Sequence, residues 1–384
     1  MARHPRPRAK RGRSRVGERF TAVVGPVAHG GHCVVRLPEP ESRVVFTRHA
    51  LPGETAVVEI TEGSEGDRFW RGDAVEILEP SPDRVVPPCP VTGPGGCGGC
   101  DFQHATLARQ RALKTDVVRE QLGRLGRLDP DDPLVAGLVV EAVPGDEGGL
   151  RWRTRVRFTN TPDGRRGMRV HRSHEVVPVD DCLIARSDAL EGGSGTVVET
   201  VETAHGHHEF PVEADGFWQI HPGAPRVLVE TVLDLLAPRP GESVLDLYSG
   251  VGLFTRFLTD AVGPGARVVA VEGDRRACAH ARRGTLGGSA RVSCGPVDQL
   301  LAASAGETFD LVVLDPPREG AGRAVVERVV DRAPRAVAYV ACDPAALARD
   351  IATFATHGYR VRALRAFDLF PMTHHVECVA LLAR

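Results

Sequence analysis

The sequence predicts an α/β protein, in which a mostly parallel sheet with helices on both faces follows a small β-barrel and a small central α+β region. Two observations carry this prediction. Short strand-like runs separated by glycine and proline fill residues 16–80, and from about residue 216 apolar strand-like runs alternate with helical patterns. Clustered short strands are typical of a closed OB-type barrel, and alternating strands and helices of a parallel sheet.

Composition places the chain among globular proteins of several domains. Its 384 residues are 42% apolar and 26% charged, which excludes a mainly disordered or fibrous chain. It has no apolar run near the roughly 20 residues that cross a bilayer and no secretory signal core, so we expect a cytoplasmic protein without a membrane partner. The expected division is a basic tail over 1–15, a barrel over 16–80, a central domain over 81–212 and the sheet domain over 213–384.

Two segments are unusually basic. Residues 1–15 carry seven arginine and lysine residues and no acidic residue, although the net charge of the chain is only −2. Such a block is usually a disordered, solvated tail, and the alternative is an arm that contacts RNA. In residues 151–157 arginines alternate with other residues, which fits a strand with one face toward solvent or a phosphate backbone.

Hydrophobic periodicity and turn residues give the elements in order. Barrel strands are expected at Phe20–Val24, His32–Val35, Arg43–Phe46, Thr55–Ile60 and Ala74–Leu78. Apolar residues at helical spacing predict a helix over Thr106–Leu125. The sheet domain is expected to begin with a helix at Ala224–Leu236 and to use strands at Ser243–Tyr248, Arg267–Val271, Leu311–Leu314, Ala336–Val340 and Cys378–Leu382.

A strand, a glycine turn and a helix meet at residues 244–253. The Gly-Val-Gly turn lets a ligand approach the backbone closely, but the third glycine of a dinucleotide site is absent. The next strand ends at Glu272, where a carboxylate suits ribose hydroxyls, and a later strand is followed by Asp315. All three features stand at carboxyl ends of strands, and together they favour S-adenosylmethionine (SAM) over NAD.

Cys342 stands at the end of a further predicted strand, on the expected cofactor side of the sheet. A lone cysteine in such a place is more often a buried apolar side chain than a nucleophile. Its neighbours decide between the two interpretations, because they belong to a set of motifs that runs through the chain. That set comprises a cysteine cluster, Phe217-Trp-Gln219, Asp246-Leu-Tyr-Ser-Gly-Val-Gly252, Val271-Glu-Gly273, Asp315-Pro-Pro-Arg318, Cys342-Asp-Pro344 and Phe370-Pro…His375-Val-Glu377.

In the order and spacing of these motifs the chain resembles the RNA uracil-5-methyltransferases of the TrmA-like family over nearly its whole length. The resemblance implies a Rossmann-like class I methyltransferase domain, an N-terminal OB-type barrel of the TRAM kind and a small central α+β domain. It also implies SAM-dependent methylation of carbon 5 of a uridine in RNA, with rRNA ranked ahead of tRNA. We expect the enzyme to act as a monomer.

The resemblance implies roles residue by residue. Cys342 would be the nucleophile and Glu377 the base. The SAM site would be lined by Gln219, Tyr248, Glu272 and Asp315. The chemistry agrees with a nucleophilic cysteine, because carbon 5 of uracil attacks a methyl sulfonium only after a thiolate has added to carbon 6. The target base must also leave its stack, which single-stranded loops permit most easily.

Two residues depart from the family's pattern. Asp343 follows the nucleophile where asparagine is usual, and His221 stands where asparagine is common. A carboxylate at position 343 is expected to disfavour a neighbouring thiolate.

Cys89, Cys97 and Cys100 cluster in a glycine-rich loop. In a cytoplasmic protein such cysteines indicate a metal site rather than disulfides. The resemblance implies Cys182 as the distant fourth ligand of a 4Fe–4S cluster, and tetrathiolate zinc is the alternative. Either group is expected to be structural, because methyl transfer needs no electron transfer.

Three other functions fit part of the sequence. RNA cytosine-5 methylation uses the same thiol addition, but its motifs differ from those around Cys342. Amine N-methylation would use Asp315-Pro-Pro-Arg318 and leave Cys342 and Glu377 unexplained. An RNA-binding or chaperone protein with weak or lost methyltransferase activity would account for the barrel, the basic tail and Asp343.

Overall fold

The computed structural model describes residues 12–284 and 290–384, which form two compact units. Most of the predicted basic tail, residues 1–11, lies outside the described residues. Unit 1 holds the chain up to Leu113 with Phe158–Cys182 and Met372–His374, and unit 2 holds Lys114–Arg157, Leu183–Pro371 and His375–Arg384. No helix in the described ranges has the length and hydropathy needed to span a bilayer.

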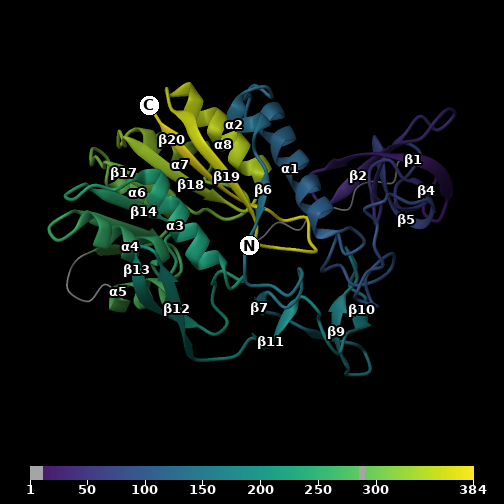
Figure 1. Ribbon diagram of the computed structural model, residues 1–384, viewed down its shortest axis with the longest axis horizontal. Coiled ribbons are helices and arrows are strands. Elements are labelled where there is room, and N and C mark those ends of the chain that lie inside the picture. Colours follow the sequence, from purple (N-terminus) through teal and green to yellow (C-terminus); the bar gives the residue numbers. More distant parts are fainter. Residues whose placement is uncertain (1–11, 285–289) are drawn as a thin grey trace. The chain divides into compact units, whose positions relative to one another are not determined.

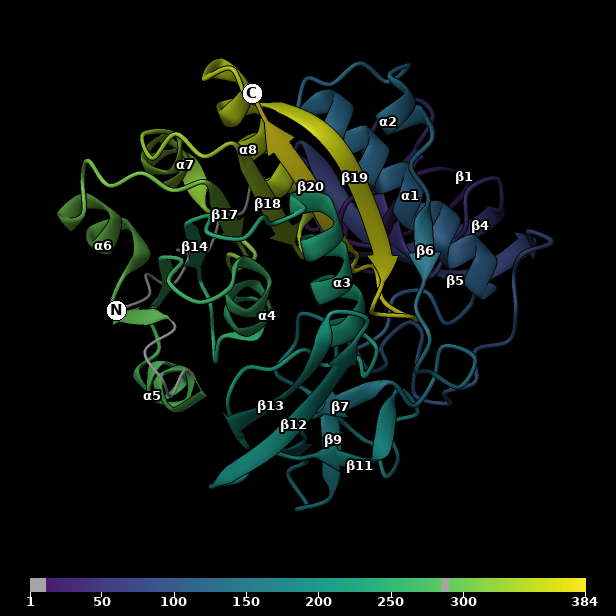
Figure 2. The same ribbon diagram turned by 60° about the vertical axis from the view of Figure 1, so that its left-hand side comes forward.

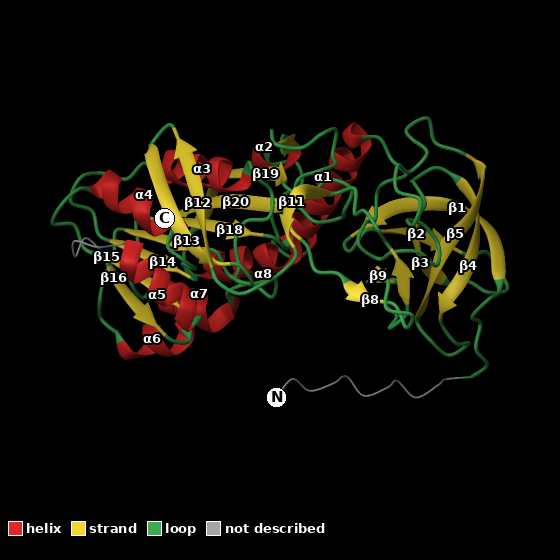
Figure 3. Cartoon of the chain, turned by 90° about the horizontal axis from the view of Figure 1, so that it is seen from below, coloured by secondary structure: helices red, strands yellow, loops and turns green. Residues whose placement is uncertain are grey.

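Unit 1 contains the predicted barrel (Figure 3). Its strands are β1 (Arg19–Ala28), β2 (His32–Arg36), β3 (Val44–Arg48), β4 (Thr55–Glu62) and β5 (Phe69–Glu79), closed in the order β1-β2-β3-β5-β4. Val45, Val58 and Trp70 fill the interior. Because side chains alternate along a strand, Phe46 and Arg71 point to the outer face of the barrel.

The rest of unit 1 is a cysteine-containing loop and a small sheet. The sheet has the order β10-β9-β8 and consists of β8 (Thr159–Asn160), β9 (Arg166–Arg169) and β10 (Val176–Pro178). The carbonyl of Met372 accepts hydrogen bonds from the backbone N–H groups of Asp101 (2.9 Å) and Phe102 (3.0 Å). These bonds tie residues 372–374 to the loop that carries the cysteines.

Unit 2 is built on an eight-stranded sheet of order β16-β15-β14-β17-β18-β20-β19-β6 (Figures 1 and 2). Its strands are β6 (Val140–Ala142), β14 (Val244–Leu247), β15 (Val268–Glu272), β16 (Arg291–Cys294), β17 (Leu311–Leu314), β18 (Ala336–Ala341), β19 (Arg360–Asp368) and β20 (Glu377–Ala383). Only β20 runs antiparallel to its neighbours, β18 and β19. The predicted strands of this sheet are all present.

Apolar side chains bury both faces of the sheet. One face packs against α1 (Leu107–Arg124), α6 (Val297–Ala303), α7 (Gly322–Val330) and α8 (Pro344–Thr356). The other packs against α3 (Ala224–Leu236), α4 (Leu253–Val262) and the hairpin of β12 (Thr196–Thr203) and β13 (Gly206–Glu213), as Figure 2 shows. Two further helices are α2 (Pro133–Ala136) and α5 (Arg275–Gly284). The predicted doubly covered, mostly parallel sheet is therefore confirmed.

The strand order reverses between β14 and β17, because the chain builds outward first through β15 and β16 and then through β17 and β18. Such a switch point leaves a crevice at the carboxyl ends of the two central strands, where ligands bind in open α/β sheets. The fold thus places the residues after β14 and β17 where the sequence predicts the SAM site.

The basic run at 151–157 differs from its prediction. Only Arg153–Arg155 form a strand, β7, which pairs with β11 (Ala185–Leu190). Arg151 donates to the carbonyl of Ala185 (3.0 Å), and Arg155 pairs with Glu199 (3.0 Å). Arg151 and Arg155 therefore bond within unit 2, whereas Arg157 is exposed, and contact of the run with solvent or a phosphate backbone stays a prediction.

Candidate active site

Three carboxylates lie at the switch point of the sheet in unit 2. Asp246 is in β14, Glu272 ends β15 and Asp315 follows β17. Asp246 is fully buried, and its Oδ2 accepts a hydrogen bond from the Thr255 hydroxyl (2.5 Å). Burial raises the pKa of Asp246 to about 7 despite that bond, and burial with the charges of Asp246 and Glu272 raises the pKa of Asp315 to about 7. A cluster of three carboxylates suits a ligand that has a positive charge and hydroxyl groups.

The glycine turn after β14 holds one of these acids in place. Gly250 and Gly252 have φ of 56° and 93°, in the left-handed region that side chains with a Cβ rarely adopt. In this conformation the N–H of Gly250 donates to Oε2 of Glu272 (2.8 Å). The other carboxylate oxygen accepts from the N–H of Asp274 (2.6 Å). The turn therefore fixes the Glu272 carboxylate between two backbone donors.

The other two predicted SAM residues lie in different surroundings. Tyr248 follows β14 with a positive φ of 63°, and burial together with the charge of Asp350 raises its pKa to about 12. Gln219 is half-buried in the segment between β13 and α3. The structure thus gathers Tyr248, Glu272 and Asp315 at the ends of three neighbouring strands, and Gln219 lies in the same unit, in the segment before α3.

Cys342 and Glu377 lie side by side where β18 ends and β20 begins. The antiparallel strands β18 and β20 pair Ala341 with Cys378, so the residue after β18 faces the first residue of β20. Glu377 is only 4% exposed, whereas Cys342 is half-buried. Two residues that are far apart in the sequence therefore become neighbours through the strand order.

Burial controls the protonation of this pair. It is the main cause that raises the pKa of Cys342 to about 12, and the charges of Glu377 and Asp315 add to it. Burial and the charge of Asp315 raise the pKa of Glu377 well above its ordinary value. The cysteine is consequently a neutral thiol in the ligand-free protein at neutral pH.

Arg318 is the cation beside this pair. Its charge lowers the pKa of Cys342 and so opposes the carboxylates. Nη2 of Arg318 lies 3.2 Å from Nε2 of His375, whose ring packs edge-on against Phe370. Arg318 and His375 stand in the motifs that carry the family resemblance, but the sequence pattern assigns neither of them a role.

Asp343 is a helix cap. Its Oδ1 accepts a hydrogen bond from the N–H of Ala346 (2.8 Å) at the first turn of α8. A carboxylate suits that position, because the first turn of a helix has unpaired N–H groups and a partial positive charge. The acids that raise the pKa of Cys342 are Glu377 and Asp315. The expectation that a carboxylate at position 343 disfavours a neighbouring thiolate stays a prediction.

His221 belongs to the core of unit 2. It is 1% exposed, stacks on Trp152, and its Nδ1 accepts a hydrogen bond from the N–H of Gly223 (3.1 Å). Burial lowers the pKa of His221 to about 4, so the ring is neutral at pH 7. The histidine thus replaces the family's asparagine as a packed neutral ring.

The four cysteines of the predicted metal site all lie in unit 1. Cys97 and Cys182 are near enough to Cys100 that their charges add to burial in raising its pKa to about 12. The N–H of Cys89 donates to the side chain of Gln103 (3.1 Å). Within residues 12–284 and 290–384, however, no group of three or more His, Cys, Asp or Glu residues is arranged to hold a metal ion. Cys97 and Cys182 are thus near Cys100, but the four thiols are not arranged as the tetrathiolate site that an iron–sulfur cluster or zinc requires.

Three family profiles match the chain. TRAM domain matches residues 13–75, Methyltransferase small domain matches 223–339, and tRNA (Uracil-5-)-methyltransferase matches 305–384, the part that contains Cys342 and Glu377. A Streptomyces coelicolor protein named as an uncharacterized RNA methyltransferase is 44% identical over 96% of this chain and 93% of its own length. The chain belongs to the RNA uracil-5-methyltransferase family.

Two other proteins extend the comparison. The 23S rRNA (uracil(1939)-C(5))-methyltransferase of Shewanella sp. (strain MR-7) is 28% identical over 91% of this chain and 93% of its own. The solved tRNA (uracil-54, C5)-methyltransferase of Pyrococcus abyssi, in complex with S-adenosyl-L-homocysteine, has a TM-score of 0.66 at 20% identity and covers 95% of this chain and 100% of its own. This RNA methyltransferase family member therefore shares a Rossmann-like fold with that enzyme and carries a TRAM barrel.

Proposed function

We propose that the protein transfers the methyl group of SAM to carbon 5 of a uridine in RNA, through a temporary bond between Cys342 and carbon 6. The observation that carries the proposal is the register of β18 and β20, which pairs Ala341 with Cys378 and so brings Cys342 close to Glu377. A thiol and a buried carboxylate at one sheet edge provide a nucleophile and a proton acceptor for the same base. The rRNA-modifying relative favours rRNA over tRNA as the substrate.

The proposed methyl transfer passes through a covalent adduct of Cys342 and uracil. The Cys342 thiol loses its proton to solvent, and the thiolate adds to carbon 6 of uracil, which places negative charge on carbon 5. Carbon 5 then forms the new carbon–carbon bond to the methyl group, while the bond between that methyl group and the sulfonium sulfur breaks and S-adenosylhomocysteine is left as the neutral product. Glu377 removes the remaining proton of carbon 5, the bond from sulfur to carbon 6 breaks, and Glu377 returns its proton to the departing thiolate. One proton is released overall.

Arg318 has a defined task in this scheme. A thiol whose pKa is raised to about 12 adds to uracil only when the thiolate is stabilised at the moment of attack. The guanidinium of Arg318 is the nearby positive charge that lowers this pKa. We assign it the stabilisation of the thiolate and of the negative charge that develops on the uracil ring.

The acids at the switch point would hold SAM. When bound, SAM supplies a methyl group on a positively charged sulfur. Glu272, fixed by the glycine turn, would accept hydrogen bonds from the ribose hydroxyls. Tyr248, Asp315 and Gln219 would line the rest of the site.

The trapping experiment uses RNA transcribed with 5-fluorouridine. Fluorine on carbon 5 cannot leave as a proton, so the enzyme should stall as a covalent protein–RNA adduct that survives a denaturing gel. Cys342→Ala should abolish the adduct, and the control Cys294→Ala, another half-buried cysteine of unit 2, should leave it intact. Sequencing the trapped RNA would distinguish rRNA from tRNA and uridine from cytidine.

Absence of an adduct while RNA binding persists would overturn the thiol mechanism and favour an RNA-binding or chaperone protein. An adduct that remains in Cys342→Ala would overturn the choice of nucleophile.

The cysteines of unit 1 are proposed to hold a structural 4Fe–4S cluster, with zinc as the alternative. Cys97 and Cys182 both lie near Cys100, which supports one metal group bound by these cysteines. Anaerobically purified protein should contain iron and sulfide, and Cys100→Ser should lose both. Purified protein with zinc instead would select the alternative, and metal-free protein that is fully folded would contradict both.

A further inference from the structure

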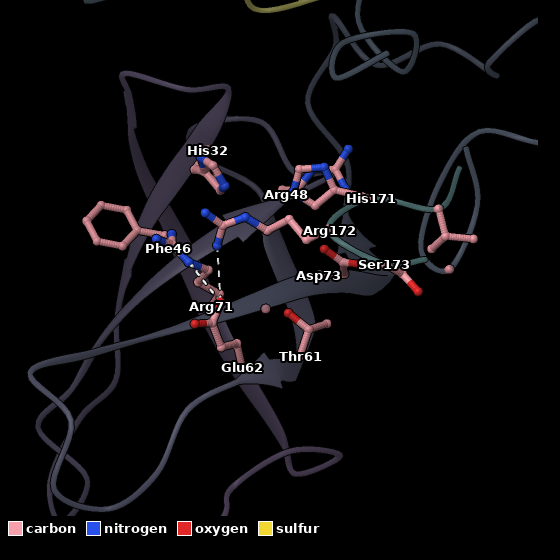
Figure 4. A pocket seen from close by; sticks show the side chains of 13 residues that line it. His32, Phe46, Arg48, Thr61, Glu62, Arg71, Asp73, His171, Arg172 and Ser173 are labelled. Carbon is pink, nitrogen blue, oxygen red and sulfur yellow. Dashed lines mark hydrogen bonds and ion pairs between the residues drawn. The ribbon is translucent and has the colours of Figure 1, made fainter. Parts of the chain in front are cut away.

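A pocket of about 410 Å³ opens on the barrel in unit 1, and none of the residues of the proposed chemistry lines it (Figure 4). The outer faces of β3 and β5 form its floor. These strands are parallel, and their register sets Phe46 opposite Arg71 and Arg48 opposite Asp73. An aromatic ring, two guanidinium groups and a carboxylate therefore line one surface.

Two buried groups in this pocket lack a hydrogen-bond partner among the described residues. Arg48 is 5% exposed, and its Nη2 makes no hydrogen bond, although it lies 3.6 Å from Oδ1 of Asp101. Nε2 of His171 is also buried without a partner. Unpaired buried polar atoms are costly and therefore rare, so such atoms around a cavity indicate a polar ligand.

A loop of the central segment forms the opposite wall. Val170 pairs with Cys97, and the N–H of Gly98 donates to the carbonyl of Arg169 (3.1 Å). These bonds hold His171 and Arg172 over the barrel, where Figure 4 shows both beside Arg48 and Arg71. Arg172 adopts a positive φ of 54°, a conformation that non-glycine residues adopt only when their surroundings impose it.

Two of the three arginines of the pocket share a single carboxylate. Arg71 and Arg172 approach the same oxygen of Glu62, at 3.2 Å and 3.1 Å. Arg48, the third arginine, lies opposite Asp73 in the strand register and 3.6 Å from Oδ1 of Asp101. The two histidines that line the pocket are His32 and His171. They add no positive charge at neutral pH, because burial is the main cause that lowers the pKa of each to about 4.

We propose that this pocket binds one nucleotide of single-stranded RNA, with its phosphate on Arg71 and Arg172 and its base against Phe46. Guanidinium groups pair with phosphate oxygens, and unstacked RNA bases pack on aromatic rings and guanidinium planes. The neutral His171 offers a ring nitrogen to a base edge. The proposal rests on the proposed function only in taking RNA as the ligand.

The test measures fluorescence anisotropy of a labelled, mixed-sequence RNA of about 12 nucleotides with the full-length protein. Arg172→Ala should weaken binding about tenfold and lower the slope of log affinity against log salt by about one, because one phosphate contact is lost. The matched control is Arg165→Ala, which removes an equally exposed arginine of the same segment that also pairs with one acid. It should change affinity less than about twofold.

Phe46→Leu separates the base from the phosphate. It should weaken binding several-fold and leave the salt slope unchanged, since stacking releases no counterions. Its circular dichroism and melting curve should match those of the wild type, because Phe46 lies on the outside of the barrel. If Arg172→Ala binds RNA as tightly as Arg165→Ala, the pocket is not an RNA site.

The adduct assay keeps the two proposals apart. At saturating RNA, Arg172→Ala should still form the 5-fluorouridine adduct, whereas Cys342→Ala should bind RNA normally and form none. If the wild type forms no adduct but Arg172→Ala still weakens RNA binding, the methylation mechanism is contradicted and the proposed RNA pocket is supported. Normal adduct formation with no effect of Arg172→Ala would do the reverse.

Discussion

At the scale of single residues, burial outweighs neighbouring charge at this active site. Desolvation is the largest cause of the raised pKa of Cys342, Glu377 and Asp246. Cys342, the proposed nucleophile, is therefore a thiol at neutral pH. The proposed mechanism needs a thiolate only when RNA and SAM are bound, and a thiol is less easily oxidised before that.

Alkylation of Cys342 by iodoacetamide should reveal this protonation state. With a pKa of about 12, the thiolate fraction rises as the pH rises toward that value, so the rate should increase about tenfold for each unit from about pH 7 to pH 10. Arg318→Met removes the charge that lowers the pKa, so it should slow the reaction further. Peptide mass spectrometry measures the rate, and Cys342→Ser identifies the peptide. A plateau below about pH 9 would contradict the raised pKa.

At the scale of elements, polar residues at helix ends and between helix and strand hold the site's framework. Asp343 caps α8 directly after Cys342. Lys114 of α1 and Asp368 at the end of β19 form an ion pair of 2.5 Å in which both side chains are 1% exposed. Lys114 also donates to the carbonyl of Phe370 (3.0 Å), a residue of the segment that leads to Glu377.

Removal of the cap should loosen α8. Asp343→Ala is expected to lower the free energy of unfolding by about 1 kcal/mol, because the N–H of Ala346 loses its acceptor. Asp343→Asn keeps an acceptor oxygen and should be within about 0.5 kcal/mol of the wild type, with adduct formation at least as fast. Urea unfolding measures the stability. If Asp343→Asn loses as much stability as Asp343→Ala, the acceptor oxygen at position 343 does not stabilise α8.

Breaking the buried ion pair should cost far more than breaking an exposed one. Lys114→Met leaves the Asp368 carboxylate buried without its cation and is expected to destabilise by about 3–5 kcal/mol. The control Arg124→Met breaks the exposed pair with Glu120 on the same helix and should cost less than about 1 kcal/mol. Chemical denaturation compares the two variants. Similar losses would mean that water reaches the buried pair.

At the scale of the whole molecule, the chain is organised as two units, and each has a core of its own. The chain crosses between them several times, so neither unit is one continuous stretch of sequence. Short segments are shared in this way: Met372–His374 belong to unit 1, although the residues on either side, including Glu377, belong to unit 2.

SAM should stabilise the two units unequally. Its proposed residues all lie in unit 2, so SAM at about 100 times its Kd should stabilise that unit by about 2.7 kcal/mol. Trp152 and Trp218 report on unit 2, and Trp70→Phe removes the tryptophan of unit 1. The fluorescence melting curve of Trp70→Phe should shift upward with SAM. An unchanged curve would place SAM elsewhere.

Local patterns in the sequence were enough to predict most elements. Helix α3 and strand β17 have the predicted bounds, because a helical face or a short apolar run is visible within one stretch of chain. Strand β19 was missed, since its arginines interrupt the apolar pattern of a buried strand. One of them, Arg365, is satisfied by a bidentate pair with Glu141, which no local pattern reveals.

The sequence by itself determined the chemical groups: a thiol and carboxylates after strands, a glycine turn, and the motifs that carry the family resemblance. Only the tertiary structure decided which of these groups meet. The antiparallel pairing of β20 with β18 sets Glu377 beside Cys342, and the parallel pairing of β3 with β5 sets Phe46 beside Arg71. Periodicity describes one segment at a time, whereas the register between distant strands follows from the packing of the whole core.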